Sequence, residues 1–366
     1  MFLENNQTIT MIKKSIAVFV KNLTSGGAEK QAVLLAKALV DDYDVHFIIL
    51  NGDKLHQKYL DLLREEERVK VVMFKGGHLK RFLSFVKYLN ENHVEAIFSY
   101  LTAANAYACI ASLFHKMKVF TGLRNAELPL LKHLADLVMT NVCADMAVAN
   151  CFSGKKNFSK HGFRSSKIEV IPNCFEHILP YMEKMNDGTV HIITVGRFVA
   201  QKDYETAIKT ISEVKKNEGN IHFDLVGYGE LEPEIRSWLK KYEVEDVTTV
   251  YINPSNIPEL LDKADIYLST SLFEGTSNSI MEGMNANMPV VCTDVGDNSY
   301  LVEDGHNGFL ASIRDYVSLA DGILRLMKDG KLRATMGRNS KEHLLKDYSV
   351  EIFKERYKQL LKGFEL

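Results

Sequence analysis

Two glutamates stand eight positions apart in SLFEGTSNSIMEGM, residues 271–284. Ser277 is a good N-cap residue, and the residues after it predict a helix over 278–287. Glu274 then lies in the loop before this helix, and Glu282 lies about one turn inside it. A carboxylate accepts two hydrogen bonds, which suits a pair of neighbouring hydroxyl groups. The spacing therefore predicts one diol site on each side of a helix N-terminus.

The segment between the glutamates offers backbone N–H groups to an anion. It reads Gly275, Thr276, Ser277, Asn278 and Ser279, and Gly275 relaxes the approach to the cap. A phosphate bound there has a diol on each side, which is the outline of a sugar nucleotide: hexose, diphosphate and ribose. Glutamates at this spacing are also common on protein surfaces, so on the pair alone the structural interpretation has equal weight.

A pair of cations follows the strand that opens the second half of the chain. In VGRFVAQKDYETA (195–207), Gly196 follows that strand, and Arg197 and Lys202 lie at its carboxyl end. Two fixed cations there neutralise a diphosphate leaving group without a metal, Arg as a planar fork and Lys as a mobile point charge. The alternative is that both are solvated loop cations.

Glycines mark two further strand-to-helix turns. Gly26 and Gly27 in KNLTSGGAEKQ stand between the first strand and its helix, where a ligand can approach the backbone. Alone they also fit an ordinary glycine-rich turn. Gly227 in VGYGELEPE predicts a tight turn beside a base pocket, together with Gly229. The dinucleotide fingerprint that this segment begins is incomplete, because Glu232 occupies the third glycine position.

Short apolar runs alternate with amphipathic segments twice along the chain. The first series of expected strands is 15–20, 45–50, 69–74, 96–99, 118–121, 146–149 and 168–171, and the second is 189–195, 221–227, 247–252, 264–270 and 289–293. Buried β-branched strands with helical crossovers indicate parallel sheets covered on both faces. We therefore expect an α/β protein of two Rossmann-like, doubly wound domains, 1–174 and 175–348, that face each other across a ligand-binding cleft.

Composition narrows the function classes. The chain has 366 residues, of which 46% are hydrophobic and 25% are charged, as in ordinary soluble proteins. Lys and Arg outnumber Asp and Glu by 23 to 16 up to residue 174, and the ratio is 22 to 31 after it, so the first half suits an anionic partner. No nucleic-acid-binding motif is present. Apolar runs are far shorter than a membrane span, and the five cysteines form no C-x-x-C pair, which favours a cytoplasmic protein.

The order and spacing of several motifs resemble those of the family 4 glycosyltransferases, which have the GT-B fold. The motifs are GGAE (26–29), GRFVAQKD (196–203), VGYGE (226–230), the glutamate pair, and VGDNSYLVEDGHNGFL (295–310). The resemblance implies that Arg197 and Lys202 bind the donor diphosphate, Glu274 the donor hexose and Glu282 the ribose, with the Ser277–Ser279 amides facing phosphate. It also implies retention of anomeric configuration, no metal or other cofactor, and a final helix, 349–366, that packs back on the first domain.

The same resemblance places the acceptor on the first domain. Many family members carry a histidine near the end of the fourth strand, but IFSYLTAANAYA (97–108) has Ser99 and a tyrosine there, and Asn105 follows. Arg124, Asn125 and Glu127 come just after the next strand, so we expect them to contact acceptor or donor. Glu127 also fits a carboxylate that interacts with a helix N-terminus.

Three further charged segments could either bind a ligand or have an ordinary structural role. Asp42-Tyr43-Asp44 is a D-x-D, a metal-binding signature in another glycosyltransferase fold, but in a short turn it is better explained as solvated carboxylates. The basic segments 75–89 and 153–167 suit anionic lipid headgroups, where lipid-linked acceptors lie, or equally, for 75–89, a core-facing helix with a solvated basic face. We predict no metal site.

These observations converge on one function. We expect a retaining, metal-independent hexosyltransferase that moves a hexose or N-acetylhexosamine from a nucleotide diphosphate sugar, UDP before GDP, to a saccharide or lipid-linked acceptor in polysaccharide or glycoconjugate synthesis. It would be cytoplasmic or peripheral on the membrane, and would not bind nucleic acid. The alternatives are a nucleotide-sugar epimerase of the same fold, which needs acid/base groups, and a non-catalytic sugar-nucleotide-binding subunit.

Overall fold

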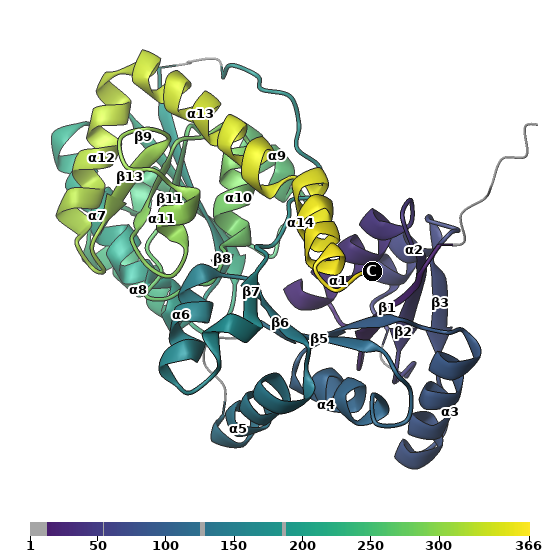
Figure 1. Cartoon of the computed structure of the whole chain (residues 1–366). Helices are drawn as coiled ribbons and strands as arrows, with labels where there is room; N and C mark the ends of the chain where they lie inside the picture. The colour runs from purple at the N-terminus through teal and green to yellow at the C-terminus, as the bar shows by residue number, and fades with distance from the viewer. Residues whose placement is uncertain (1–12, 54, 125–128, 185–187) are drawn as a thin grey trace, which may run out of the picture. The chain divides into compact units, whose positions relative to one another are not determined.

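The computed structural model describes residues 13–53, 55–124, 129–184 and 188–366. The chain forms two compact units (Figure 1). Unit 1 comprises the residues up to Ala149, Asn157–Ile171 and Lys354–Leu366, and unit 2 comprises Asn150–Lys156 and Pro172–Phe353. The chain thus passes between the units more than once, and each unit is discontinuous in sequence.

Among the described residues, unit 1 is built on a parallel sheet of seven strands in the order β3-β2-β1-β4-β5-β6-β7. The strands are β1 (Ser15–Val20), β2 (Asp44–Ile49), β3 (Lys70–Met73), β4 (Ala96–Tyr100), β5 (Lys118–Leu123), β6 (Met146–Ala149) and β7 (Ile168–Val170). The helical segments are α1 (Gly27–Leu39), α2 (Gln57–Arg64), α3 (His78–Glu91), α4 (Thr102–Ala111), α5 (Leu130–Val138), the π-helical turn η1 (Met139–Cys143), α6 (Phe152–Lys160), whose first half belongs to unit 2, and η2 (Ser165–Lys167). In Figure 1, α3, α4 and α5 follow one another along one face of this sheet.

Unit 2 has a parallel sheet of six strands among its described residues, in the order β10-β9-β8-β11-β12-β13. The strands are β8 (Val190–Arg197), β9 (Ile221–Tyr228), β10 (Thr248–Ile252), β11 (Ile266–Ser269), β12 (Val290–Thr293) and β13 (Gly308–Ala311). The helical segments are η3 (Ala200–Lys202), α7 (Tyr204–Asn217), α8 (Glu232–Lys241), η4 (Glu245–Val247), α9 (Ile257–Lys263), α10 (Asn278–Asn285), α11 (Asn298–Leu301), α12 (Tyr316–Lys328), α13 (Gly330–Tyr348) and α14 (Val350–Lys362), whose last turns belong to unit 1.

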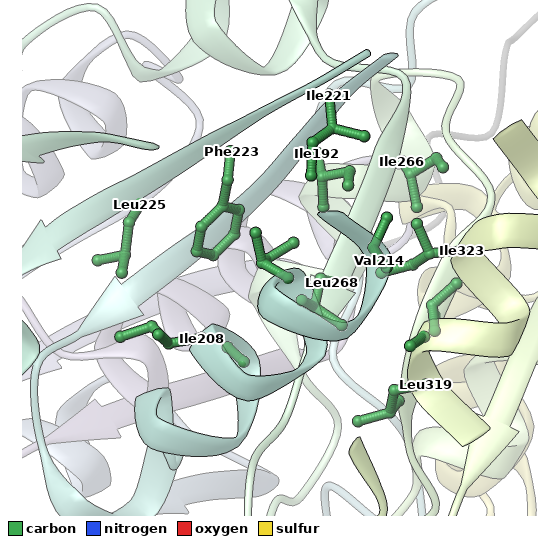
Figure 2. Close-up of a cluster of buried hydrophobic side chains, with 14 of the residues drawn as sticks. Ile192, Ile208, Val214, Ile221, Phe223, Leu225, Ile266, Leu268, Leu319 and Ile323 are labelled. Atoms are coloured by element: carbon green, nitrogen blue, oxygen red, sulfur yellow. The ribbon is translucent and has the colours of Figure 1, made fainter. Parts of the chain in front are cut away.

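The interior of unit 2 explains why its strands read as apolar runs. Branched and aromatic side chains of β8, β9 and β11 pack against α7 and α12 (Figure 2). Ile192, Phe223 and Leu268 from the sheet, and Ile211 and Ile323 from the two helices, have no exposed surface. Burial of each such side chain stabilises the fold by about 1.5–3 kcal/mol. This packing fixes the strand ends on which the loops of unit 2 are mounted.

The fold class expected from sequence is confirmed: both sheets are parallel and doubly wound. One strand was missed. Most of β13 lies inside the VGDNSYLVEDGHNGFL motif, and the strand pairs with β12 at the edge of the sheet. Its four residues follow a glycine- and asparagine-rich turn, so the apolar signal is too short to distinguish a strand from a loop.

Both D-x-D carboxylates of unit 1 are in ion pairs, and one of them contacts α14. Asp42 pairs with Lys354 at 3.0 Å and with Lys358 at 2.8 Å, both on α14. Asp44 pairs with Lys70 at 2.6 Å. The ring of Tyr357, one turn along α14, packs edge-on against a phenylalanine of β4 with centroids 5.2 Å apart. The expectation of simple solvated carboxylates is therefore wrong, because both are in ion pairs.

Candidate functional site

The strand order of unit 2 reverses between β8 and β11, which is where open parallel sheets bind their ligands. A cavity of about 430 Å³ lies at this point. The sequence-predicted residues that line it are Gly196, Arg197, Lys202, Gly227, Glu274, Thr276, Ser277, Asn278, Ser279 and Glu282. Its lining also includes Gln201, Tyr228, Asn253 and Ile257, which the sequence did not single out. Gly196 and Glu282, which are 86 positions apart in the chain, thus line the same cavity.

Several hydrogen bonds join the loop after β8 to the loop after β11. The Leu272 N–H donates to the carbonyl of Gln201 at 2.8 Å, and the Gln201 side chain donates to the carbonyl of Phe273 at 2.8 Å. The Thr270 hydroxyl lies 3.0 Å from the carbonyls of Lys202 and Asp203. The loop that carries the cations is therefore fixed against the loop that carries Glu274, before any ligand binds.

Lys202 and Glu274 form the tightest ion pair of this cavity. The Lys202 ammonium lies 2.6 Å from Oε1 of Glu274, with 17 and 10% of the two side chains exposed. The Ser271 hydroxyl donates to the same Oε1 at 2.7 Å. Within the described chain the other oxygen, Oε2, has no hydrogen-bond donor, so it can accept from a hydroxyl group of a ligand.

Arg197 contrasts with Lys202. It is the last residue of β8, its side chain is exposed, and no described residue accepts a hydrogen bond from it. A guanidinium in this state keeps its planar fork available to a phosphate. The site therefore holds one cation fixed by a carboxylate and one that is open to a ligand.

Helix α10 begins as the sequence predicted. Ser277 is its N-cap, and the Ser277 hydroxyl accepts from the Ile280 N–H at 3.4 Å. The Thr276 hydroxyl donates to the carbonyl of Asn150 at 2.7 Å, which anchors the turn. Gly275 does not line the cavity; it lies against Cys151 instead. The first-turn N–H groups of α10 point into the site as a ready anion-binding position.

Glu282 lies one turn inside α10 and is half-buried beside Tyr267. The Tyr267 hydroxyl donates to the carbonyl of Val195 at 3.2 Å, and burial, aided by the charge of Glu282, raises the pKa of this tyrosine. Tyr267 thus stays neutral in the hydrophobic core next to Glu282. The helix ends at Asn285, two residues earlier than expected, because Ala286 already leaves the helical conformation.

Two glycines, Gly227 at the end of β9 and Gly229 just after it, pack closely against the end of β8 and Phe198. Gly227 pairs with Gly196 across β8 and β9, and a Cβ at Gly227 would overlap the Gly196 carbonyl and the Phe198 ring. Gly229 has a φ of +152°, which side-chain-bearing residues rarely adopt. These contacts confirm the tight strand-to-helix turn read from VGYGE.

Unit 1 has a corresponding cavity at its own switch point, between β1 and β4. It measures about 250 Å³. The residues that line it include Lys21, Asn22, Thr24, Glu29, Tyr100, Leu101, Thr102, Arg124, Lys132 and Asp136. Gly26, the N-cap of α1, and Gly27, its first residue, do not line it. The Glu29 side chain lies over the position that a Cβ of Gly26 would take, and it accepts from the Thr24 hydroxyl at 2.7 Å.

Ser99 and Asn105 lie in the interior of unit 1, with 1 and 0% of their surfaces exposed. The Ser99 hydroxyl donates to Oδ1 of Asn105 at 2.8 Å, and the Asn105 amide donates to the carbonyl of Gly122 at 3.1 Å. These bonds leave neither side chain a group to offer an acceptor. Of the other acceptor candidates, Arg124 lines the unit 1 cavity, whereas Asn125 and Glu127 lie outside the described residues.

Arg124 is positioned by two aromatic residues. Its guanidinium lies 4.5 Å from the centroid of the Tyr100 ring and donates to the Tyr357 hydroxyl at 3.3 Å. Leu101, next in the chain, has φ 71° and ψ 154°, a strained combination for a residue with a side chain. The strand-to-helix turn after β4 is thus held in an unusual shape at the mouth of this cavity.

Asp136 is a lining residue of unit 1 that the sequence analysis missed. It accepts from the Thr102 hydroxyl at 2.6 Å and from the Asn105 amide at 3.0 Å, and it is 2% exposed. Burial raises the pKa of its carboxyl group, which these two hydrogen bonds oppose. The sequence does contain one indication of it, because Asp136 is the single acidic residue of α5, LLKHLADLV.

Two family models match the chain. One, described as Glycosyl transferases group 1, matches residues 182–343, and the other, described as Glycosyltransferase Family 4, matches residues 25–177. The chain belongs to the family 4 glycosyltransferases. The first of these matches spans both glutamates and the two cations of the unit 2 cavity, so the enzyme is a glycosyltransferase that carries its motif residues in one assembled site.

Relatives of this glycosyltransferase include two N-acetylhexosaminyltransferases. One, from Campylobacter jejuni, is the N-acetylgalactosamine-N,N'-diacetylbacillosaminyl-diphospho-undecaprenol 4-alpha-N-acetylgalactosaminyltransferase. The two sequences are 24% identical over 377 residues, which is 95% of this chain and all of the relative. A poly(ribitol-phosphate) alpha-N-acetylglucosaminyltransferase from Staphylococcus aureus is 26% identical over 45% of this chain and 34% of its own length.

Solved structures share the fold. HepE from Anabaena, in complex with UDP, matches with a TM-score of 0.80 at 19% identity, over 96% of this chain and all of HepE. The lipopolysaccharide outer core galactosyltransferase WaaB matches with a TM-score of 0.77 at 15% identity, over 95% of this chain and 99% of WaaB. At these identities the likeness establishes the GT-B fold alone.

The part of the chain that the structure describes contains neither a candidate metal-ligand cluster nor a candidate membrane-spanning helix. No three His, Cys, Asp or Glu side chains gather there as metal ligands would. No helix among the described residues combines the length and the apolar character needed to cross a bilayer.

Proposed function

We propose that this glycosyltransferase transfers a hexose or N-acetylhexosamine from a UDP-sugar, with retention and without a metal, to a saccharide or lipid-linked acceptor. The observation that carries this proposal is the unit 2 cavity, which brings Arg197, Lys202, Glu274 and Glu282 together at a strand switch point. The resulting product would belong to a surface polysaccharide or another glycoconjugate.

The cavity accounts for each part of such a donor. The first-turn N–H groups of α10 and the open guanidinium of Arg197 would hold the diphosphate. Oε2 of Glu274 would accept from a hexose hydroxyl, and Glu282 would bind the ribose diol. Lys202, held by Glu274, would place its positive charge where the leaving diphosphate gains negative charge. UDP is favoured because HepE, which has the same fold, was solved with UDP and with UDP-glucose.

The chemical step requires no covalent enzyme intermediate. The bond between the anomeric carbon and the diphosphate oxygen breaks, and the acceptor oxygen bonds to the anomeric carbon on the same face. The acceptor proton passes to an oxygen of the leaving diphosphate, so UDP departs and the configuration is retained. The protein contributes positioning and charge stabilisation.

We place the acceptor on unit 1. Its cavity presents the ammonium groups of Lys21 and Lys132 and the guanidinium of Arg124, which suits an acceptor that carries phosphate. A diphospho-undecaprenol-linked acceptor, as named for the Campylobacter jejuni relative, has this chemistry and lies at a membrane. We therefore also propose peripheral contact of unit 1 with the cytoplasmic face of the membrane.

Calorimetric titration with UDP and GDP, each in a metal-free buffer, tests the donor. Wild type should bind UDP more tightly than GDP, and Glu282→Ala should weaken UDP binding by about 1.5–3 kcal/mol, because a charge-assisted pair of hydrogen bonds is lost. Glu234→Ala, an exposed glutamate of α8 outside the cavity, is the matched control and should bind UDP as wild type does. Failure of folded wild type to bind either nucleotide would contradict the proposal.

Acceptor-dependent turnover separates the remaining alternatives. A transferase releases UDP from a UDP-sugar only when an acceptor is present. An epimerase would convert the sugar with no acceptor, and a non-catalytic subunit would bind the nucleotide without turnover in either condition. Thin-layer or mass-spectrometric analysis of the sugar and of free UDP distinguishes the three outcomes.

A further inference from the structure

Helix α5 exposes its apolar side chains and buries its acidic one. The exposed residues recur at helical spacing and continue into the π-helical turn η1; they are Leu130, Leu131, Leu134, Val138 and Val142, each with 46 to 82% of its surface exposed. Asp136, in the same helix, is directed inward to Thr102 and Asn105. We call the five exposed residues the α5 face. An apolar helical face of this kind normally packs against a core or against another apolar surface.

Exposed apolar residues continue on the two neighbouring helices. They are Leu79 and Leu83 of α3, and Ile110, Leu113 and Phe114 at the end of α4. The rings of Phe82 and Phe114 meet edge-on with centroids 6.2 Å apart, which joins α3 to α4. The Thr102 hydroxyl joins α4 to α5 through Asp136. Figure 1 shows the three helices in a row on the same side of the unit 1 sheet.

Cations flank the α5 face. Lys132 is exposed within α5 itself. The segment 157–167 packs against α5, since the His133 ring lies against the rings of Phe158 and Phe163 with centroids 6.5 and 5.2 Å apart. This segment contains two lysines and an arginine and no acidic residue. Among residues 129–143 the only acidic side chain is the buried Asp136. The surface is therefore apolar at its centre and positive at its edge.

We propose that the α5 face is the surface with which this enzyme lies on a membrane that contains anionic lipids. Apolar side chains on an amphipathic helix enter the boundary between headgroups and acyl chains, and the flanking cations bind anionic headgroups. A second copy of the chain fits less well, because a paired α5 face would oppose Lys132 and Lys160 to their own counterparts. The proposal specifies the membrane contact of the proposed function and rests on that function for its link to the acceptor.

The position of α5 connects this surface to the unit 1 cavity. Lys132 and Asp136 line that cavity, whereas Leu130, Leu131 and Leu134 of the same helix are exposed. When the α5 face lies on a bilayer, the cavity opens at the level of the headgroups. A phosphate of a lipid-linked acceptor, which lies at that level, then reaches Lys132 without leaving the membrane surface.

Vesicle sedimentation with the full-length protein tests the proposal. The vesicles are phosphatidylcholine alone, and phosphatidylcholine mixed with phosphatidylglycerol. We expect binding to the mixed vesicles and a loss of about tenfold or more in Leu131→Glu/Leu134→Glu, because two apolar side chains leave the interface and two negative charges enter it. Lys160→Ser, on the adjacent segment, should weaken binding about fivefold. The matched control is Val317→Glu/Leu345→Glu, two exposed apolar residues of unit 2, which should bind as wild type does.

Several results would overturn the proposal. These are no binding to mixed vesicles, equal binding to pure phosphatidylcholine, or unchanged binding of Leu131→Glu/Leu134→Glu. Light scattering that detects a dimer in wild type, and a monomer in this variant, would assign the α5 face to a second copy instead. Titration of the same samples with UDP shows whether each variant is folded. It also separates the two proposals. A wild type that does not bind UDP contradicts the proposed donor site, whereas a wild type that binds UDP but not the mixed vesicles contradicts only the proposed role of the α5 face.

Discussion

The two switch-point cavities stand on the same strand topology but distribute charge in opposite ways. In unit 2 the carboxylates face the cavity, and one of its two cations, Lys202, is held by Glu274. In unit 1 the carboxylates are tied to their own surroundings, Glu29 to Thr24 and Asp136 to Thr102, while neither Lys21 nor Lys132 is in a hydrogen bond or close ion pair through its side chain among the described residues. The strand topology therefore determines where a ligand binds. The side chains of the loops that line each cavity determine which part of the ligand binds there.

The comparison also explains which site residues a sequence can reveal. Glu274 follows the end of β11 by several residues, so its side chain is free of the sheet. Ser99 stands within β4, where both faces of a parallel sheet are covered by helices, and it is buried. Residues at the strand ends or beyond them can turn toward the cavity. Polar residues inside the strand form the interior network that supports it.

Neutralising Lys202 should have the largest effect and tests whether unit 2 carries the chemistry. We expect Lys202→Met to lower kcat about 100- to 1,000-fold, because the charge opposite the leaving diphosphate is lost. Arg197→Met should raise the Kd for UDP and also lower kcat. Initial rates of UDP release with acceptor present, over a range of UDP-sugar concentrations, measure both.

Thermal unfolding separates these two variants further. Lys202→Met removes an ion-pair partner from a nearly buried glutamate and should lower Tm, whereas the exposed Arg197 has no described partner and its loss should leave Tm unchanged. A normal kcat in Lys202→Met would show that a residue other than Lys202 stabilises the leaving diphosphate. The ion pair of Lys202 with Glu274 would then not explain how the unit 2 cavity differs in function from the unit 1 cavity.

Removing the lysines of unit 1 should have an intermediate effect and a different signature. We expect Lys21→Met and Lys132→Met each to raise the KM for a phosphate-bearing acceptor about tenfold, which corresponds to one charge-assisted hydrogen bond. The Kd for UDP, measured by calorimetry, should not change. A variant that weakens UDP binding as strongly as acceptor binding would place the lysine at the donor instead.

The sequence predicted the frame of the molecule better than its second cavity. Long buried strands such as β1 have a strong periodic signal, and the cap at Ser277 has a specific chemical one, so both were found. β13 was not, because an edge strand of four residues has too few buried positions. Asp136 was overlooked for a different reason: α5 exposes three of its four leucines and buries its carboxylate, which is the opposite of the usual amphipathic pattern.

Replacing Asp136 with asparagine should have the smallest effect, a change in the free energy of unfolding. It tests whether Asp136, unlike Glu274, acts without its negative charge. Because burial raises the pKa of Asp136 in the folded state, the folded protein binds its proton more tightly than the unfolded chain does. The stability that Asp136 contributes is thus fully present below its unfolded pKa, near 3.9, and is lost as the pH rises through the folded pKa. Asp136→Asn cannot ionise and can keep a hydrogen bond to Thr102 and to Asn105. At neutral pH the free energy of unfolding of Asp136→Asn should be between equal to that of wild type and about 1 kcal/mol higher. The difference should become smaller as the pH falls, because wild-type Asp136 then becomes protonated.

Urea unfolding of wild type, Asp136→Asn and Asp136→Ala at several pH values measures these terms. Asp136→Ala should be less stable than both by about 1–3 kcal/mol, because the Thr102 hydroxyl and the Asn105 amide then lose their acceptor in a buried site. If Asp136→Asn were as damaging as Asp136→Ala at neutral pH, the negative charge itself would be required. Asp136 would then belong with Glu274 as a carboxylate that acts through its charge, and the division between the two cavities would have to be redrawn.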